Sequence, residues 1–294
     1  MRKSLLSIAL FAAFAVPSLA NHLSDFYVIP VAIRAPGAFG TDWTTDVSIH
    51  NFGTTPLTVE FLFIESGEGN SQNVFNLESD AIPTGSLTIA PGGTEIVRDV
   101  LNGFQGRTEG LLGSLAISGS APFALMSRTF TAGAAGGSFG QTVPPVQGFV
   151  ENTIGDTDIA GAVAYLPGVV TNGSFRTNVG FLAASGDAGM TVTAELRLAD
   201  GTSGGTRTFT IPANRFVHVQ FPAASIGTAT FDEASVRLRI TAGSGAVTPY
   251  ASIVDNISGD AVFVPGNFPP TTSVFKRGIE QSHFRTLLLR NYGR

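Results

Sequence analysis

The chain contains no cysteine. This absence excludes disulfide bonds, thiolate metal sites, a cysteine nucleophile and lipid attachment through an N-terminal cysteine. Charged residues are scarce as well, at 13% of the chain against 43% for hydrophobic residues. Disordered chains have the opposite balance, so we expect a packed body that is stabilised by burial of an apolar core.

Basic residues are too few for a nucleic-acid-binding surface. The chain has 17 Lys and Arg against 22 Asp and Glu, a formal charge of −5. Loss of Arg2 and Lys3 with a leader peptide would leave 15 basic residues against 22 acidic ones, a charge of about −7. Because binding of phosphate backbones needs a basic footprint, we expect no nucleic-acid partner.

The N-terminus has the pattern of a secretory signal peptide. Arg2 and Lys3 precede an apolar run over residues 5–16, and small residues precede a cleavage point after Ala20. This run is too short for a comfortable membrane span, and no later segment is long and apolar enough for one. We therefore expect a cleaved signal peptide over residues 1–20, no transmembrane span, and export to the periplasm, the cell surface or the medium.

Alternation of apolar and polar residues is the strongest pattern in the mature chain. Over residues 191–198 the apolar side chains occupy every second position, which is typical of a half-buried antiparallel strand. Similar or more apolar segments predict four further strands, over residues 57–64, 115–117, 217–221 and 236–241. Turn residues lie between the strands, at Pro91-Gly92-Gly93, Asp200-Gly201 and Gly243-Ser244-Gly245.

The chain also contains an internal repeat. Segments 29–30, 41–47, 57–64, 87–94 and 124–127 correspond in order to 166–167, 174–179, 191–198, 209–216 and 249–252, and each copy ends in Val-Pro. We therefore expect an all-β fold with two tandem immunoglobulin-like antiparallel β-sandwich domains, over residues 21–145 and 162–266. Residues 146–161 would be a linker, and 267–294 a basic C-terminal tail.

Several short sequence motifs in this chain are similar to motifs of a known group of proteins. They are Phe175-Arg176-Thr177-Asn178, Ser127-Arg128-Thr129-Phe130 with Gly140-Gln141, and the stretch 251–256 with Gly259-Asp260. The mature chain thereby resembles uncharacterised bacterial secreted proteins with tandem β-sandwich repeats. That resemblance implies a layout and no particular activity. Thr44 stands in the first copy where the second has Arg176, so any role of this arginine belongs to one copy alone.

No motif assembles a catalytic site. The string from Gly201 to Gly205 places Ser203 in a G-x-S-x-G pattern, but it lies between two alternating segments rather than between a strand and a helix. The four histidines, His22, His50, His218 and His283, are too far apart in sequence to indicate a zinc pair. We expect His50 and His218 to be solvated residues on the polar sides of their strands. We also expect the protein not to be an enzyme, with a hydrolase as the alternative.

Binding residues can be suggested only as hypotheses. Trp43, Tyr165, Phe175 and Tyr250 could offer a flat face to a sugar, and we include Arg176 among the candidate ligand-binding residues. For Trp43 and Phe175, which occupy equivalent positions in the two copies, a core or inter-sheet role is the competing explanation.

A calcium site is the one cofactor that the residues suggest. Asp255, Asn256 and Asp260 place oxygen ligands in a short loop, as Ca²⁺ would require. The same residues are also ordinary turn residues that hydrogen-bond their own backbone. Apart from Ca²⁺, we expect no cofactor.

These observations favour a non-catalytic envelope or extracellular protein with a structural, adhesive or protein-binding role. A carbohydrate-binding module is one alternative. A surface subunit that polymerises by adding a strand to its neighbour's sheet is another. The expected partners are envelope or extracellular proteins or glycans, with self-association as a further possibility.

Overall fold

The computed structural model describes residues 23–67, 74–133, 136–147 and 163–267. Its strands pair in antiparallel fashion, and the described residues contain three short 3₁₀ helices but no α-helix. The expected all-β class is therefore confirmed. The expected signal peptide and all but the first residue of the expected tail lie outside the described residues.

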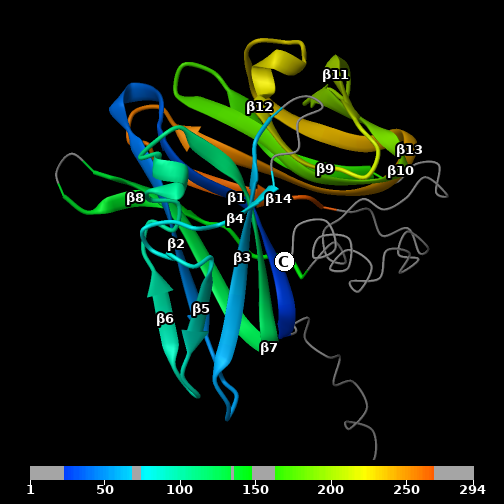
Figure 1. The fold of residues 1–294 in the computed structure, drawn as a ribbon. Coiled ribbons are helices and arrows are strands. Elements are labelled where there is room, and N and C mark those ends of the chain that lie inside the picture. The colour runs from blue at the N-terminus through cyan, green and yellow to red at the C-terminus, as the bar shows by residue number, and fades with distance from the viewer. Residues whose placement is uncertain (1–22, 68–73, 134–135, 148–162, 268–294) are drawn as a thin grey trace, which may run out of the picture.

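The strands form two sheets, which follow each other along the chain (Figure 1). The first sheet defines the first module, with β1 (Ser24–Pro36), β2 (Asp42–His50), β3 (Leu57–Glu65), β4 (Val74–Asn76), β5 (Ser86–Ile89), β6 (Thr94–Val97), β7 (Leu111–Ala132) and β8 (Ser138–Thr142). The second sheet defines the second module, with β9 (Val163–Thr171), β10 (Phe175–Leu198), β11 (Ser203–Ile211), β12 (Phe216–Pro222), β13 (Phe231–Asp255) and β14 (Ala261–Pro265). The 3₁₀ helices are η1 (Ala38–Gly40), η2 (Phe104–Gly106) and η3 (Ala223–Ile226).

Long strands shape both sheets. The first part of β7 pairs with β1 and β3, whereas its later part pairs with β2 and β8. One continuous strand thus joins two groups of partners, and the first sheet curls into a half-barrel (Figure 1). In the second sheet, β10 and β13 pair with each other along most of their length.

The two modules share a strand-pairing pattern. Leu57 of β3 lies opposite Ile89 of β5, and Met190 of β10 lies opposite Ile211 of β11. In each module a threonine hydroxyl bonds both backbone groups of one residue on a neighbouring strand. These contacts join Thr45 to Ile33, at 2.9 and 3.1 Å, and Thr177 to Val170, at 3.1 and 2.5 Å. The later half of β10 therefore corresponds to β3, and its first half to β2.

The pairing also corrects the alignment of the two sequence copies. Ser127 lies opposite Val47 in the first module, and Ala251 lies opposite Val179 in the second. Ser127 is thus the counterpart of Ala251 rather than of Ser252, so the expected match of 124–127 with 249–252 is wrong by one residue. The counterpart of Tyr250 is then Met126.

Gly243-Ser244-Gly245 is not a turn between strands, as the sequence predicted. It lies inside β13, where the pairing with β10 shifts register between Ser185 and Met190. Gly243 and Gly245 have φ values of 75° and 152°. Glycine tolerates such values without steric cost, so the strand passes through an irregularity and continues.

The modules pack against each other. Each has its own apolar cluster, and a third cluster contains Phe26, Val28 and Ile64 of the first module with Leu182 and Phe216 of the second. This shared cluster is buried, so the two sheets form a continuous body in which side chains from both modules are closely packed. Val146, the first residue of the expected linker, hydrogen-bonds Val28 in both directions at 2.8 Å. Residues 148–161 of that linker lie outside the described residues.

Candidate ligand-binding cleft between the modules

The β10, β12 and β13 strands present alternate side chains to two different surroundings. Val179, Val219 and Ala251, at odd positions, belong to the second module's own core. Leu182 and Tyr250, at even positions, pack instead in clusters with first-module residues. Because side chains alternate across a strand, this part of the second sheet is buried on both faces.

A cavity of about 330 Å³ lies between the modules beside this covered face. The first module contributes mostly apolar side chains to its lining, among them Val31, Ile33, Ala35, Pro36, Trp43 and Leu112. The second module contributes Arg176, Asn178, Gln220, Ser252 and Val254. The cleft therefore has one largely apolar side and one largely polar side.

The polar side is backed by three hydrogen-bonded side chains. The Tyr250 hydroxyl donates to Gln220 Oε1 at 2.9 Å, and the same hydroxyl lies 2.8 Å from His218 Nε2. Since a hydroxyl has one proton and Tyr250 gives it to Gln220, His218 Nε2 is the donor in the second bond. Gln220 reaches the cavity, whereas Tyr250 and His218 are fully buried behind it.

The prediction of a solvated His218 is wrong. The side chain is 0% exposed, because the first module covers the face of β12 that alternation marked as polar. Burial lowers the pKa of His218 from 6.5 to about 3, so the ring is neutral at physiological pH. Its Nδ1 has no hydrogen-bond partner among the described residues.

Tyr250 is held in place by close packing. Its ring stacks on those of His218 and Phe263, with centroids 5.9 and 5.7 Å apart. It also lies against Gly180, directly opposite on β10, where a Cβ atom would overlap the ring. Burial raises the pKa of the Tyr250 hydroxyl well above 10.0, so it remains protonated and able to donate.

Arg176 brings a positive charge to the cleft. Its Nη1 donates to Asn256 Oδ1 at 2.8 Å, which connects the start of β10 to the loop after β13. Partial burial lowers the pKa of this guanidinium below its usual value. Among the described residues that line the cavity, Arg176 is the only charged one.

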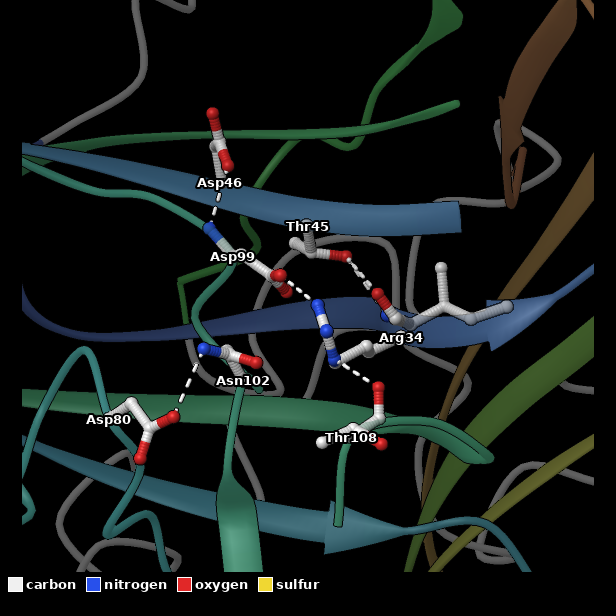
Figure 2. A network of polar contacts seen from close by, with 8 residues as sticks. Arg34, Thr45, Asp46, Asp80, Asp99, Asn102 and Thr108 are labelled. Carbon is white, nitrogen blue, oxygen red and sulfur yellow. Dashed lines mark hydrogen bonds and ion pairs between the residues drawn. The ribbon is translucent and has the colours of Figure 1, made fainter. Parts of the chain in front are cut away.

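A polar network in the first module supports the largely apolar side of the cleft, which this module forms (Figure 2). Arg34 pairs with the carboxylate of Asp99 and donates through Nε to the backbone oxygen of Thr108. The backbone N–H of Asp99 donates to Asp46 Oδ1 at 2.8 Å, and burial raises the pKa of Asp46. Arg34 thereby ties the loops at Asp99 and Thr108 to β1.

This network fixes the strand segment that lines the cleft. Ile33 and Ala35, the neighbours of Arg34, both line the cavity. Because successive side chains of a strand point to opposite sides, Arg34 holds the segment from the side away from the cavity. Asp99 has a left-handed φ of 47°, which is uncommon for a residue other than glycine and places its backbone N–H toward Asp46.

The structure brings two of the four predicted ligand-binding residues together. Trp43 and Arg176 both line the cavity, and Trp43 clusters with Val254 of the second module. Tyr165 and Phe175 are each 37% exposed and do not line it. Tyr250 is fully buried, so it offers no exposed face to a sugar.

The predicted calcium ligands form a hydrogen-bonded turn. Asp255 Oδ1 accepts the backbone N–H groups of Ile257 and Ser258, and Asp260 Oδ1 accepts that of Ala261. The first two bonds lower the pKa of Asp255. In the part of the chain that the structure describes, no group of three or more His, Cys, Asp or Glu side chains is placed to hold a metal ion.

The remaining sequence candidates lie apart from the cleft. Ser203 begins β11 at an exposed position, and its hydroxyl accepts from the backbone N–H of Gly205 at 3.4 Å. His50 Nδ1 lies 2.9 Å from the Thr94 hydroxyl on the neighbouring strand. His22 and His283 are outside the described residues.

Sequence reasoning did not select Gln141, Asn178, Gln220 or His218 for the site. Asn178 and Gln220 occupy the even positions of β10 and β12, which alternation alone assigns to a solvated face. The one available signal is a difference between the two copies. Gln220 pairs with Gly180 in the second module, whereas the equivalent pair in the first module is Ile96 with Ser48.

Comparison with known proteins adds little to this geometry. No family model and no curated protein matches the chain. Among solved structures, the crystal structure of Thermotoga maritima 1070 is similar with a TM-score of 0.30 and 13% identity, over 39% of this chain and 100% of that chain. A likeness this weak carries no argument. No helix within the described residues is long and apolar enough to cross a membrane.

Proposed function

We propose that the protein is an exported, non-catalytic binding protein of the cell envelope or the extracellular space. Its ligand occupies the cleft between the two modules. The observation that carries the proposal is the cavity itself, which combines a largely apolar wall from one module with a polar wall from the other. Small-molecule sites in proteins commonly have this character and commonly lie between domains.

Close packing of the modules supports the cleft as a preformed site. Trp43 and Ile33 of the first module cluster with Val254 and Ala261 of the second beside the cavity. Both walls therefore belong to a buried interface, and a ligand would not have to order them. Tandem β-sandwich domains of immunoglobulin size, as the repeat suggests, would serve here as the two halves of one binding unit.

The chemistry of the lining supports binding rather than catalysis. General acid–base catalysis at neutral pH needs a titratable side chain within reach of the substrate. Arg176 is the only ionisable residue among the described residues of the lining, and its guanidinium stays protonated in that range. His218 lies behind the wall as a neutral, buried residue.

A matched pair of cavity variants tests the proposal. Ala35→Trp places an indole in the cavity, whereas Ala213→Trp adds the same group at an exposed turn after β11. We expect a screen of glycans and small metabolites to yield compounds that bind the mature chain and the Ala213→Trp variant but not Ala35→Trp. Circular dichroism melts would establish that both variants are folded. Binding that survives in Ala35→Trp would place the ligand elsewhere and refute the proposal.

A further inference from the structure

Two glutamines at the cavity, Gln220 of the second module and Gln141 of the first, have amide oxygens that already accept hydrogen bonds from the protein. Gln220 Oε1 accepts from the Tyr250 hydroxyl at 2.9 Å, and Gln141 Oε1 accepts from the Ser252 hydroxyl at 3.1 Å. Each glutamine keeps an amide NH₂ group with two N–H donors. Within the part of the chain that the structure describes, neither NH₂ group has a hydrogen-bond partner, and both glutamines line the cavity.

Among the described residues of the lining, these donors accompany one positively charged side chain and no carboxylate. Arg176 lines the same cavity, and the described lining contains no Asp or Glu. On β10 and β12, Arg176 and Gln220 share the even-numbered face, and Gln220 lies directly opposite Gly180. A guanidinium with amide N–H groups forms a set of donors that suits a planar carboxylate, since charge-assisted bonds to an anion are the strongest available to such groups.

We infer that the cleft binds a small organic anion whose carboxylate is held by Arg176, Gln220 and Gln141. The rest of the ligand packs against the apolar wall, where Trp43 and Ile33 lie. This inference rests on the proposed function and names its ligand class. Sugar acids and apolar organic acids share the required carboxylate, and the experiment below separates them.

Tyr250 and His218 act as positioning residues for this carboxylate. The neutral ring of His218 donates to Tyr250, and Tyr250 donates to Gln220 Oε1. The direction of these two hydrogen bonds fixes the orientation of the Gln220 amide. Its NH₂ group therefore remains available to a ligand in the cavity. Without the tyrosine hydroxyl, the amide could rotate and present its oxygen to the anion instead.

Calorimetric titration at neutral pH with matched probes tests the inference. The probes are glucuronate against glucose, benzoate against benzyl alcohol, and inorganic phosphate. We expect at least one carboxylate to bind more than about tenfold more tightly than its neutral partner, as expected for a charge-assisted hydrogen bond. Preference for glucuronate would identify sugar acids as the ligand class, and preference for benzoate would identify apolar acids.

Variants with matched controls locate the binding. Gln220→Glu keeps the shape of the side chain but adds a negative charge, and we expect it to weaken carboxylate binding by more than about tenfold. Ile96→Glu is the control, because Ile96 is the first-module counterpart of Gln220 and is 49% exposed away from the cleft. Arg176→Gln should weaken binding to a similar extent, whereas Ile96→Glu should leave it unchanged.

Tyr250→Phe separates positioning from general stability. We expect it to reduce the ratio of the affinity for a carboxylate to the affinity for its neutral partner. A fold that is merely loosened would leave this ratio unchanged.

The inference is overturned if neutral probes bind as tightly as carboxylates and Ala35→Trp abolishes that binding. The cleft would then bind a ligand of another class. It is equally overturned if phosphate alone binds. Absence of binding by every probe would contradict the carboxylate site, whereas the proposed function would then depend on the wider screen.

Discussion

Acidification should destabilise the protein through His218, and the size of the effect follows from burial. In the unfolded chain this histidine has a pKa near 6.5, whereas burial lowers its pKa in the folded protein to about 3. Between these values the unfolded state binds a proton that the folded state excludes. The stability that is present above pH 6.5 is therefore lost as the pH falls toward 3.

The magnitude can be worked out for a moderate change of pH. Each unit below 6.5 contributes about 1.4 kcal/mol, so the loss at pH 5 relative to pH 8 is about 2 kcal/mol from this residue. Tyr250, the titratable side chain hydrogen-bonded to His218, has a raised pKa and stays protonated over this range. The result depends only on His218 remaining neutral in the folded state at pH 5.

Urea unfolding of the wild type and of His218→Gln at pH 8 and pH 5 measures this contribution. The glutamine amide can still donate to Tyr250 but does not titrate, while the carboxylates are the same in both proteins. We expect the wild type to lose about 2 kcal/mol more than the variant over this change of pH. Equal losses would show that His218 takes up its proton in the folded state, and would refute its burial behind the cleft.

Three further substitutions test packing and hydrogen bonding within the modules. Gly180→Ala places a methyl group in the ring of Tyr250, so we expect a loss of about 1–3 kcal/mol in unfolding free energy, and an unchanged value in chemical denaturation would contradict the close approach. Thr177→Val leaves both backbone groups of Val170 without their side-chain partner, for a cost of about 1–3 kcal/mol. Thr45→Val should cost at least as much in the same assay, because Thr45 Oγ1 also lies 3.0 Å from Thr129 Oγ1, and a clearly smaller loss would argue against equivalent roles.

The sequence was sufficient for the fold class and for five strand segments, which lie within β3, β7, β10, β12 and β13. Alternation over 191–198 and 217–221 lies within β10 and β12, and the turn at Asp200-Gly201 connects β10 with β11. Local alternation works because each strand has one face in its own module's core. It fails at Gly243-Ser244-Gly245, where glycines with positive φ allow a strand to continue through an irregularity.

The site could be predicted only in part, because it depends on packing between segments that are distant in sequence. Trp43 and Arg176 were selected from the sequence, and the cleft brings them together. Gln220 and His218 were missed, since period-two reasoning treats the second face of a strand as solvated. That face is covered by the other module, and the sequence of β12 itself does not indicate this contact.

Side-chain amide signals offer the most direct test of a carboxylate site in the cleft. In ¹⁵N–¹H correlation spectra of residues 21–294, the NH₂ groups of Gln220 and Gln141 can be assigned by substitution and followed during titration with glucuronate and benzoate. A ligand that binds as inferred will shift both NH₂ signals in a saturable way, and will shift neither with the neutral partner of the probe. Saturable binding of a carboxylate that leaves both signals in place would contradict the site.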